Sequence, residues 1–127
     1  MTLSAIEIVQ EFYRRMNSND FQAAAEVLSE AYILEWPQSK ERIRGRANFV
    51  AVNVEYPAYG PWCFTINRIV ASATEVVSDV SITNGTQVAR AITFHTVRDG
   101  LILKQVEFWP ENYLAPESRK HLVERMD

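Results

Sequence analysis

Charged and aromatic side chains in the second half of the sequence are of the types that carry acid/base chemistry. Asp79, Arg90 and Glu107 lie on β-prone segments, and Trp109 follows Glu107 closely. Apolar surroundings raise the pKa of a carboxyl group, which lets it exchange protons near neutral pH. Glu107 is therefore the best acid/base candidate. Arg90 could orient Glu107 or polarise a substrate oxygen, and Asp79 could hold Arg90 or activate water.

Other kinds of catalytic site have little support in the sequence. Cys63 is the single cysteine, which excludes an intrachain disulfide and a cysteine-based metal cluster. His95 and His121 are the only histidines and do not form a paired-ligand motif on one helix. The four glycines are isolated, so the chain has no glycine-rich phosphate loop. We therefore expect neither a metal ion nor another cofactor.

Length and composition indicate one globular domain over residues 1–127. The net charge of -3 leaves no surplus of Lys and Arg to neutralise a phosphate backbone, which argues against nucleic acid as a partner. No apolar run approaches the roughly 20 residues that span a bilayer. The N-terminus is typical of an amphipathic helix rather than of a signal peptide. We therefore expect a cytoplasmic protein that does not bind membranes.

Three helices and one strand are predicted in the first half. Ser4 and Glu7 form a capping-box signature before apolar residues at spacings of three and four, which indicates a helix. Asp20 can cap a second, Ala-rich helix, and Pro37 ends a β-prone run. The predicted elements are helices over about 4–17, 21–28 and 47–54, a strand over 31–36 and a polar loop over 38–45.

The second half is typical of an antiparallel meander. Asn84-Gly85 and Asp99-Gly100 each stand between β-prone runs and suit two-residue hairpin turns. The predicted strands cover about 62–71, 75–83, 86–98 and 101–109, and residues 116–127 could form a terminal helix. Helices followed by a meander predict an α+β fold and exclude a doubly wound parallel sheet.

Two-residue turns would fix the register of these strands. Thr83 would face Thr86, and Arg98 would face Leu101. One face of the sheet would then carry the predicted pairs Asp79–Arg90, Arg90–Trp109, Ile92–Glu107 and Phe94–Gln105. The opposite face would carry His95, which is more typical there of an interface or surface histidine than of a catalyst.

Two interpretations of the charged face remain open. It could line a cavity with convergent polar groups, while a partner subunit covers the other face. Alternatively, Asp79 and Arg90 could form a solvated cross-strand pair that contributes under about 1 kcal/mol. Arg90 close to Glu107 would also lower the pKa of Glu107, so a structural ion pair competes with the catalytic interpretation.

Aromatic residues from both halves could surround a ligand. The predicted cage consists of Phe12, Tyr13, Trp36, Trp62 and Trp109, and the predicted lining also includes Tyr32, Ile92, Phe94 and Gln105. The hydroxyl groups of Tyr13 and Tyr32 could donate hydrogen bonds. Aromatic side chains in a core are the more common explanation, but in a hollow fold the core and the pocket wall share residues.

Four sequence motifs carry a family resemblance. They are Glu11-Phe12-Tyr13, the run from Asn17 to Phe21, the run from Trp36 to Gly45, and Glu107-Phe108-Trp109. With the order of elements, they resemble the SnoaL-like proteins and ketosteroid isomerases of the nuclear-transport-factor-2-like (NTF2-like) superfamily. The resemblance implies a cone in which a strongly curved, mixed or antiparallel sheet and three helices of the N-terminal half enclose a pocket. It also implies that the face with Asp79, Arg90 and Glu107 is the inner one.

The isomerase residues do not carry over to this chain. Phe12 matches the position of the oxyanion-binding tyrosine, Trp36 that of the aspartate base, and Phe94 that of the protonated aspartate. Steroid isomerisation needs a base and oxyanion donors, so the resemblance does not imply that activity by the usual residues. Epoxide-hydrolase-like and cyclase-like members are the better analogy, because they use carboxylates and an arginine on the meander strands.

Two functions follow as hypotheses, and the sequence does not decide whether the chain is an enzyme. The first is a SnoaL-like pocket protein that acts as an acid/base enzyme, of isomerase, cyclase or hydrolase type, on a small apolar or polyketide-like molecule. The second is a non-catalytic ligand-binding or dimerisation module. A homodimer through the outer sheet face is expected in either case. A third, weaker hypothesis is an interaction protein that uses its open sheet face.

Overall fold

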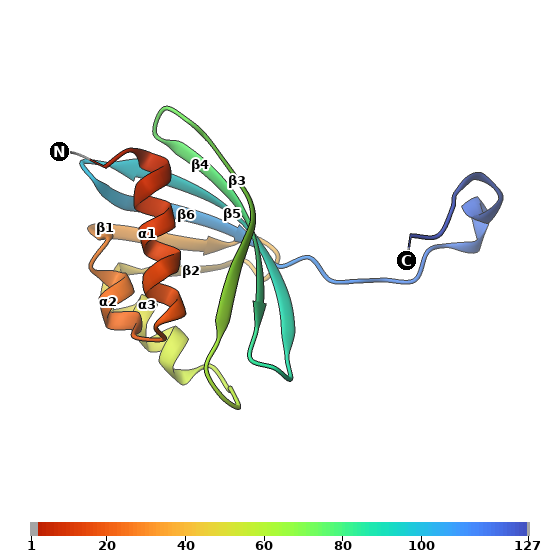
Figure 1. The fold of residues 1–127 in the computed structure, drawn as a ribbon, viewed down its shortest axis with the longest axis horizontal. Coiled ribbons are helices and arrows are strands. Elements are labelled where there is room, and N and C mark those ends of the chain that lie inside the picture. The colour runs from red at the N-terminus through yellow and green to blue at the C-terminus, as the bar shows by residue number, and fades with distance from the viewer. Residues whose placement is uncertain (1–2, 127) are drawn as a thin grey trace.

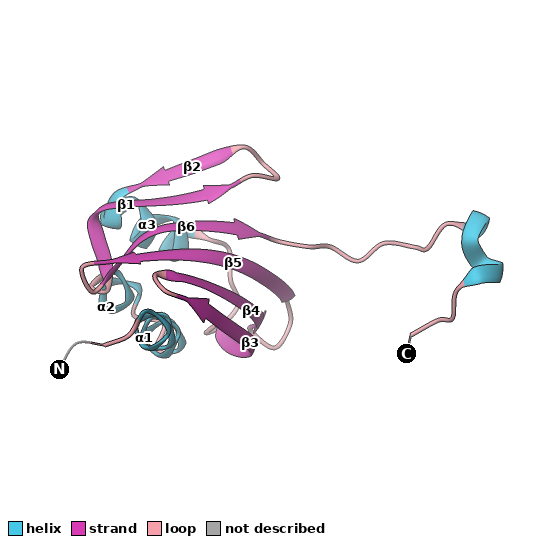
Figure 2. Ribbon diagram, turned by 90° about the horizontal axis from the view of Figure 1, so that it is seen from above, coloured by secondary structure: helices cyan, strands magenta, loops and turns pink. Residues whose placement is uncertain are grey.

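A computed structural model describes residues 3–126. Three helices cover the concave side of one curved sheet (Figures 1 and 2). The sheet order is β2-β1-β6-β5-β4-β3, with β1 and β6 parallel and the other neighbours antiparallel. The elements are α1 (Ala5–Asn17), α2 (Phe21–Ala25), β1 (Leu28–Trp36), β2 (Glu41–Arg44), α3 (Gly45–Glu55), β3 (Cys63–Ser72), β4 (Glu75–Thr83), β5 (Val88–Arg98), β6 (Leu101–Phe108) and the 3-10 helix η1 (Glu117–Leu122). The predicted α+β class, with three helices and a curved sheet, is confirmed.

Helix α1 supplies one wall of the core. The predicted capping box is present, because the Ser4 side chain accepts from the Glu7 backbone and Glu7 accepts from the Ser4 backbone. One face of the helix buries Ile8, Val9, Phe12, Tyr13 and Met16. These side chains belong to the hydrophobic core between the helices and the sheet. The 3- and 4-residue spacing of the apolar residues thus places Phe12 and Tyr13 in the interior.

Two elements of the first half differ from the sequence predictions. The second helix ends at Ala25, and Leu28 already belongs to β1, where it pairs with Ile102 of β6. The predicted polar loop contains strand β2, which pairs with β1 in antiparallel fashion. An ion pair between Arg42 and Glu35 crosses this pairing at 2.7 Å. Short polar edge strands are stabilised mainly by such partners, which local sequence preference does not reveal.

The two hairpins differ in a way that decides which side chains face inward. Asp99 and Gly100 have φ of 53° and 75° and form the predicted two-residue turn. The other turn is longer: Thr83 pairs with Val88 instead of Thr86, because the Asn84 side chain accepts from the backbone N–H groups of Thr86 and Gln87. This change of register is an even number of residues, so it leaves the faces of β4 and β5 as predicted.

A β-bulge at Leu103 shifts β6 by one residue. Val97 pairs with Ile102, but the next residue, Thr96, pairs with Lys104. From there on, β6 presents the opposite set of side chains to each face. Glu107 therefore pairs with Thr93 and not with Ile92, and Gln105 pairs with His95 and not with Phe94. The predicted pairs across this hairpin are wrong for that reason.

Two asparagine side chains join the end of α1 to the start of β3. Asn17 donates to the Phe64 carbonyl at 2.9 Å and accepts from its N–H at 2.6 Å. Asn19 makes the same pair of hydrogen bonds with Trp62, at 2.7 Å each way. Both amides therefore pair with the backbone as a neighbouring strand would. Asn19 also has a φ of 59°, which asparagine tolerates better than alanine does.

Replacing Asn19 by alanine should lower the free energy of unfolding by about 2 kcal/mol, because two partly buried hydrogen bonds are lost and φ is strained. Asn19→Gly should cost less, since glycine accepts this φ and loses only the hydrogen bonds. Urea unfolding of the wild type and both variants measures the difference. Equal losses for the two variants would show that the backbone conformation contributes nothing.

The chain leaves the body after β6. Residues 110–126, here named the C-terminal arm, extend away from the helices and carry η1 near their far end (Figures 1 and 2). All seventeen residues of this arm are exposed. The predicted terminal helix is present only as η1, and Asp127 lies outside the described residues. No helix within residues 3–126 is long and apolar enough to cross a membrane.

Candidate functional site

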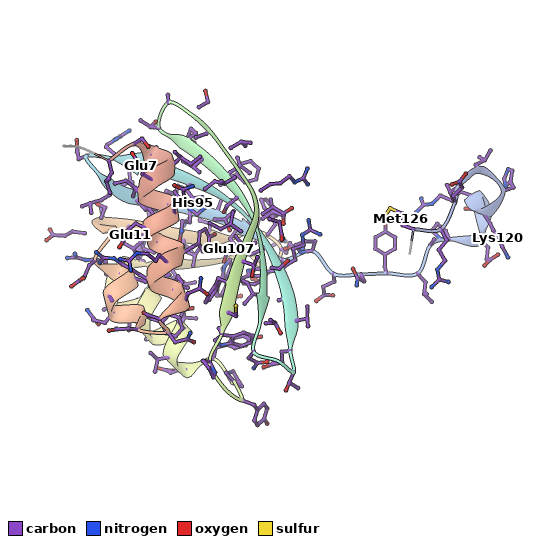
Figure 3. All side chains as sticks on the ribbon, viewed as in Figure 1. Glu7, Glu11, His95, Glu107, Lys120 and Met126 are labelled. Carbon is purple, nitrogen blue, oxygen red and sulfur yellow. The ribbon has the colours of Figure 1, made fainter. Side chains whose placement is uncertain are left out.

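The inner face of the sheet carries a set of polar side chains that the register brings together. Ser78, Thr93, His95, Gln105 and Glu107 all point toward the helices, among small and apolar neighbours. His95 is fully buried, which corrects its prediction as an interface or surface residue. The reason is the bulge at Leu103, which places His95 on the same face as Glu107. Figure 3 shows both residues within the body of the protein.

Asp79 and Arg90 lie on the outer face. Arg90 donates from Nε to Asp79 Oδ1 at 2.7 Å and from a terminal nitrogen to Oδ2 at 2.5 Å, and its side chain is 52% exposed. The Arg90 guanidinium holds the pKa of Asp79 well below its usual range. Glu107 points to the other side of the sheet, so the predicted shared face of Asp79, Arg90 and Glu107 is wrong. Asp79 and Arg90 form an ion pair across the two strands, as in the alternative interpretation, but Asp79 lies opposite Ile92 instead of Arg90 and its side chain is only 9% exposed.

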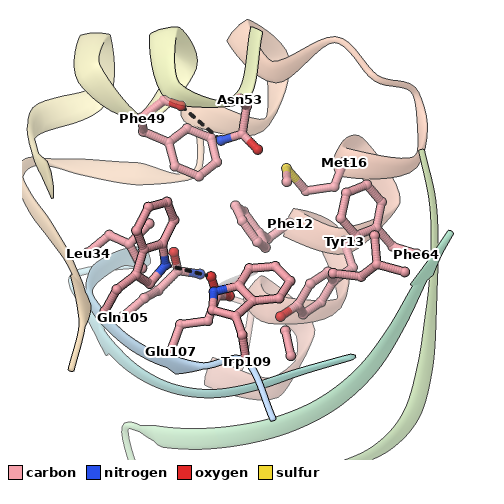
Figure 4. Close-up of a pocket in the computed structure, with 13 residues that line it drawn as sticks. Phe12, Tyr13, Met16, Leu34, Phe49, Asn53, Phe64, Gln105, Glu107 and Trp109 are labelled. Carbon is pink, nitrogen blue, oxygen red and sulfur yellow. Dashed lines mark hydrogen bonds between the residues drawn. The ribbon is translucent and has the colours of Figure 1, made fainter. Parts of the chain in front are cut away.

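A cavity of about 60 Å³ lies between the helices and the inner face (Figure 4). Its walls come from α1, α3 and five strands, and most of its lining is aromatic or aliphatic. The lining residues are Phe12, Tyr13, Met16, Leu34, Trp36, Phe49, Asn53, Phe64, Ile82, Ala91, Gln105, Glu107 and Trp109. This volume accommodates a few water molecules or a very small organic molecule.

Glu107 is the charged residue of this lining. Trp36 Nε1 donates to one carboxylate oxygen at 3.0 Å, and Thr93 Oγ1 donates to the other at 2.7 Å. None of the ion pairs within residues 3–126 includes Glu107. Burial raises the pKa of Glu107 above its ordinary value, although the two hydrogen bonds partly oppose this. A carboxyl group in this state can take up or release a proton at the cavity wall.

A buried hydrogen-bond network stands behind the cavity. The Tyr32 hydroxyl donates to Gln105 Oε1, so the amide nitrogen of Gln105 faces His95 Nδ1, at 3.1 Å. Neutral His95 then carries its proton on Nε2 and donates to Ser78 Oγ at 2.8 Å. Burial lowers the pKa of His95 to about 3, which keeps the ring neutral.

The direction of the remaining bonds follows from this tautomer. Because Ser78 accepts from His95, its own proton goes to the Tyr13 hydroxyl, 3.0 Å away. Thr93 lies next to Ser78 on the neighbouring strand, close to Tyr13, and donates its proton to Glu107. Successive donors therefore point from His95 toward the Glu107 carboxylate. Such an alignment stabilises the ionised carboxylate and fixes its orientation.

Several of the residues predicted to surround a ligand lie around the cavity. Phe12, Tyr13, Trp36 and Trp109 line the cavity, and Gln105 does so as well. Tyr32 is not part of the lining but contacts the lining residues Gln105 and Phe49, and Trp62 packs against Tyr56 outside the lining. The predicted lining role of Ile92 and Phe94 is wrong, since both lie on the outer face.

Sequence reasoning missed several residues of the site. The main ones are Thr93, Ser78, His95, Phe49 and Asn53. Thr93 and His95 lie on the same face of β5 as Ala89 and Ala91. A strand face made of small and polar residues is the sequence pattern that could have identified this face as the inner one. Asn53 donates to the Phe49 carbonyl at 2.9 Å, one helical turn earlier, and no sequence pattern indicates that contact.

Helices on a curved sheet with a cavity between them define the NTF2-like, ketosteroid-isomerase-like fold. A crystal structure from Kribbella flavida DSM 17836, of a candidate ketosteroid isomerase, is 34% identical with a TM-score of 0.88, and the match covers 97% of this chain and 90% of that one. Residues 9–105 match the family model of the SnoaL-like domain. The chain belongs to the SnoaL-like domain family.

More distant solved structures share the fold. An epoxide hydrolase of M. tuberculosis, described as LEH-like, is 20% identical with a TM-score of 0.68, over 84% of this chain and 82% of that one. A Catenulispora acidiphila DSM 44928 protein with a ketosteroid isomerase-like fold, in complex with trimethylamine, is 12% identical with a TM-score of 0.68, over 80% and 83%. No curated protein matches the chain.

Proposed function

We propose that this SnoaL-like domain is an acid/base enzyme of isomerase, cyclase or hydrolase type that acts on a small, largely apolar molecule. The observation that supports this best is Glu107, a cavity-facing carboxyl group with a raised pKa and two neutral donors. Asp79 and Arg90 take no part, because they lie on the outer face. Pairing of Glu107 with Trp36 and Thr93 leaves the group free to move a proton, which a salt bridge to arginine would oppose.

The shape of the cavity limits the substrate. A volume of about 60 Å³ is well below the several hundred cubic ångströms of typical drug-sized ligand pockets. A polyketide-sized molecule would need Phe12, Phe49 or Trp109 to move. We therefore expect small ketones, enones or epoxides to fit before larger molecules do.

The test is a screen of such small molecules for turnover by the wild type, Glu107→Gln and Asp79→Asn. Glutamine keeps the size of Glu107 but cannot carry a proton, and Asp79→Asn makes the same chemical change on the outer face. Turnover by the wild type and Asp79→Asn, but not by Glu107→Gln, is the expected result. Equal turnover by all three proteins would exclude Glu107 as the acid/base group.

A second candidate function is the binding of a small organic cation without catalysis. A carboxylate among aromatic rings is the arrangement that holds alkylammonium ions, through charge pairing and cation–π attraction. Trimethylamine, present in the Catenulispora acidiphila structure, belongs to this chemical class. Calorimetric titration with tetramethylammonium and with neutral tert-butanol separates the two functions. Binding of the cation alone, lost in Glu107→Gln, would favour the second function.

We also propose a cytoplasmic homodimer that uses the outer sheet face. That face exposes Val70 of β3 and both Val88 and Phe94 of β5, with β4 between the two strands. Clustered apolar side chains on a sheet are typical of a surface that another subunit covers.

A further inference from the structure

The C-terminal arm carries large apolar side chains that its own chain leaves exposed. Leu114 is 95% exposed and Met126 is 93% exposed, and Tyr113, Leu122 and Val123 are also exposed. Figure 3 shows Lys120 at the far end of the arm and Met126 where the chain turns back, both well away from His95 and Glu107. Burial of a large apolar side chain contributes roughly 1.5–3 kcal/mol. An arm with five such side chains therefore gains considerably from a surface to pack on.

The body of the same chain offers a matching apolar surface. Phe94 is 46% exposed on the outer face and packs edge-on against Phe108, the last residue of β6. Val70 and Val88 continue this surface toward β3 and the far end of β5. The arm starts directly after Phe108 but extends away from the body, so it does not cover the outer face of its own chain.

We propose that two copies of this chain exchange their C-terminal arms, each arm packing on the outer sheet face of the other copy. A two-fold axis places both arms on both faces at once, so the exposed apolar residues of each arm and of each outer face find partners in one closed dimer. The inference extends the proposed homodimer by naming the segment that forms it. It does not depend on Glu107 or on catalysis.

The area available agrees with a stable dimer. An unfolded chain exposes about 1.45 Å² per dalton, so an extended arm of this length exposes on the order of 3,000 Å². Burial of one third of each arm and of an equal area of the facing sheet would remove well over 2,000 Å² from water. Stable interfaces bury roughly 1,200–2,000 Å². The arms alone are therefore sufficient for a stable dimer.

A solved relative supports the arm as a shared feature. The match to the Kribbella flavida structure covers 97% of this chain, which leaves only about four residues unmatched. The match must therefore include most of the arm. A second crystal structure, of an NTF2-like protein from Burkholderia xenovorans LB400 at 23% identity, also matches 97% of the chain.

The test begins with the oligomeric state. Leu114→Glu/Leu122→Glu places charges on two exposed arm residues outside the core, so the body should fold normally, as circular dichroism can verify. We expect a wild-type dimer by light scattering and a dissociation constant at least about 100-fold weaker for the double variant. Ser118→Glu, a charge on a polar arm position, serves as the control. A monomeric wild type, or an unchanged dimer in the double variant, would overturn the proposal.

Crosslinking distinguishes arm exchange from an arm that folds back. The chain has three lysines, of which Lys104 lies on the outer face of β6 and Lys120 on the arm. Isotope-labelled and unlabelled protein are mixed, unfolded and refolded together. An amine crosslinker should then join Lys120 of a labelled chain to Lys104 of an unlabelled chain, and the reverse. Crosslinks of Lys120 to Lys104 within one isotope only, or none between them, would contradict the exchange.

Discussion

Replacing Glu107 by glutamine is expected to lower kcat by about 10²–10⁴-fold on any substrate that the wild type turns over. This is the usual contribution of a positioned general acid or base. Glutamine has nearly the same shape, its oxygen can still accept from Trp36, and the Thr93 hydroxyl can rotate to accept from the amide nitrogen, so the fold and the cavity should be retained. The measurement is kcat and KM for both proteins across pH 4–9. A change in KM alone would assign Glu107 to substrate binding and not to proton transfer.

The pH profile gives a second, independent indication of the role of Glu107. Burial raises its pKa, while the hydrogen bonds from Thr93 and Trp36 lower it. Thr93→Val and Trp36→Phe should therefore move the acidic limb of the rate profile to higher pH. If Glu107 acts as a base, each variant should lose activity in the region just above the wild-type limb. A limb that stays in place in both variants would show that another group titrates there.

Wild-type protein should lose stability as the pH falls below 6.5, because His95 is held neutral in the fold. The pKa of His95 is about 3 in the folded state and about 6.5 in the unfolded chain. The unfolded state therefore binds the proton first, and stability present above pH 6.5 is lost as the pH falls toward 3. The full effect is about 5 kcal/mol, at up to about 1.4 kcal/mol per pH unit.

Urea unfolding at pH 7, 6 and 5 measures this slope in the wild type and in His95→Gln. We expect a flatter slope for His95→Gln, whatever its stability at pH 7. Val76→Ala, in the same buried face, is the control for a general loss of stability, and its slope should match that of the wild type. Identical slopes for the wild type and His95→Gln would show that the ring is accessible to protons in the fold.

Glu107 produces the opposite dependence, so the two groups must be separated. Its raised pKa means that the folded state keeps a proton that the unfolded state has lost. This contribution is fully present below the ordinary pKa of a glutamate and is lost as the pH rises through the folded pKa. The slope of His95 is therefore best measured in the Glu107→Gln background.

The sequence predicts most of the framework of this fold. The capping box at Ser4, the apolar spacing of the first helix and the Asp99-Gly100 turn each depend on neighbours within a few residues. The structure confirms all three. Strand β2 was missed, because Glu41–Arg44 is stabilised by pairing with β1, a partner that local sequence does not show.

The candidate site was predicted only in part. Glu107, Phe12 and Trp36 were placed in the cavity by their apolar surroundings and by the family resemblance. The error came from Leu103: the bulge is one extra residue, and no turn signal marks it. A one-residue shift exchanges the two faces of a strand, so Arg90 and Asp79 were grouped with Glu107, and His95 was assigned to the wrong side.

The same bulge makes the chemistry of this protein sensitive to the register of a single strand. Deletion of Leu103 would make the ladder regular and keep Glu107 opposite Thr93, whereas regular pairing of the full strand, with Leu103 opposite Thr96, would turn Glu107 and Gln105 toward solvent and bring Val106 and Phe108 into the interior. A slip of one residue at this point would thus convert the polar cavity wall into an apolar core while keeping the topology. Changes that favour or remove the bulge, more than substitutions in the cavity, are where relatives of this chain would gain or lose a function.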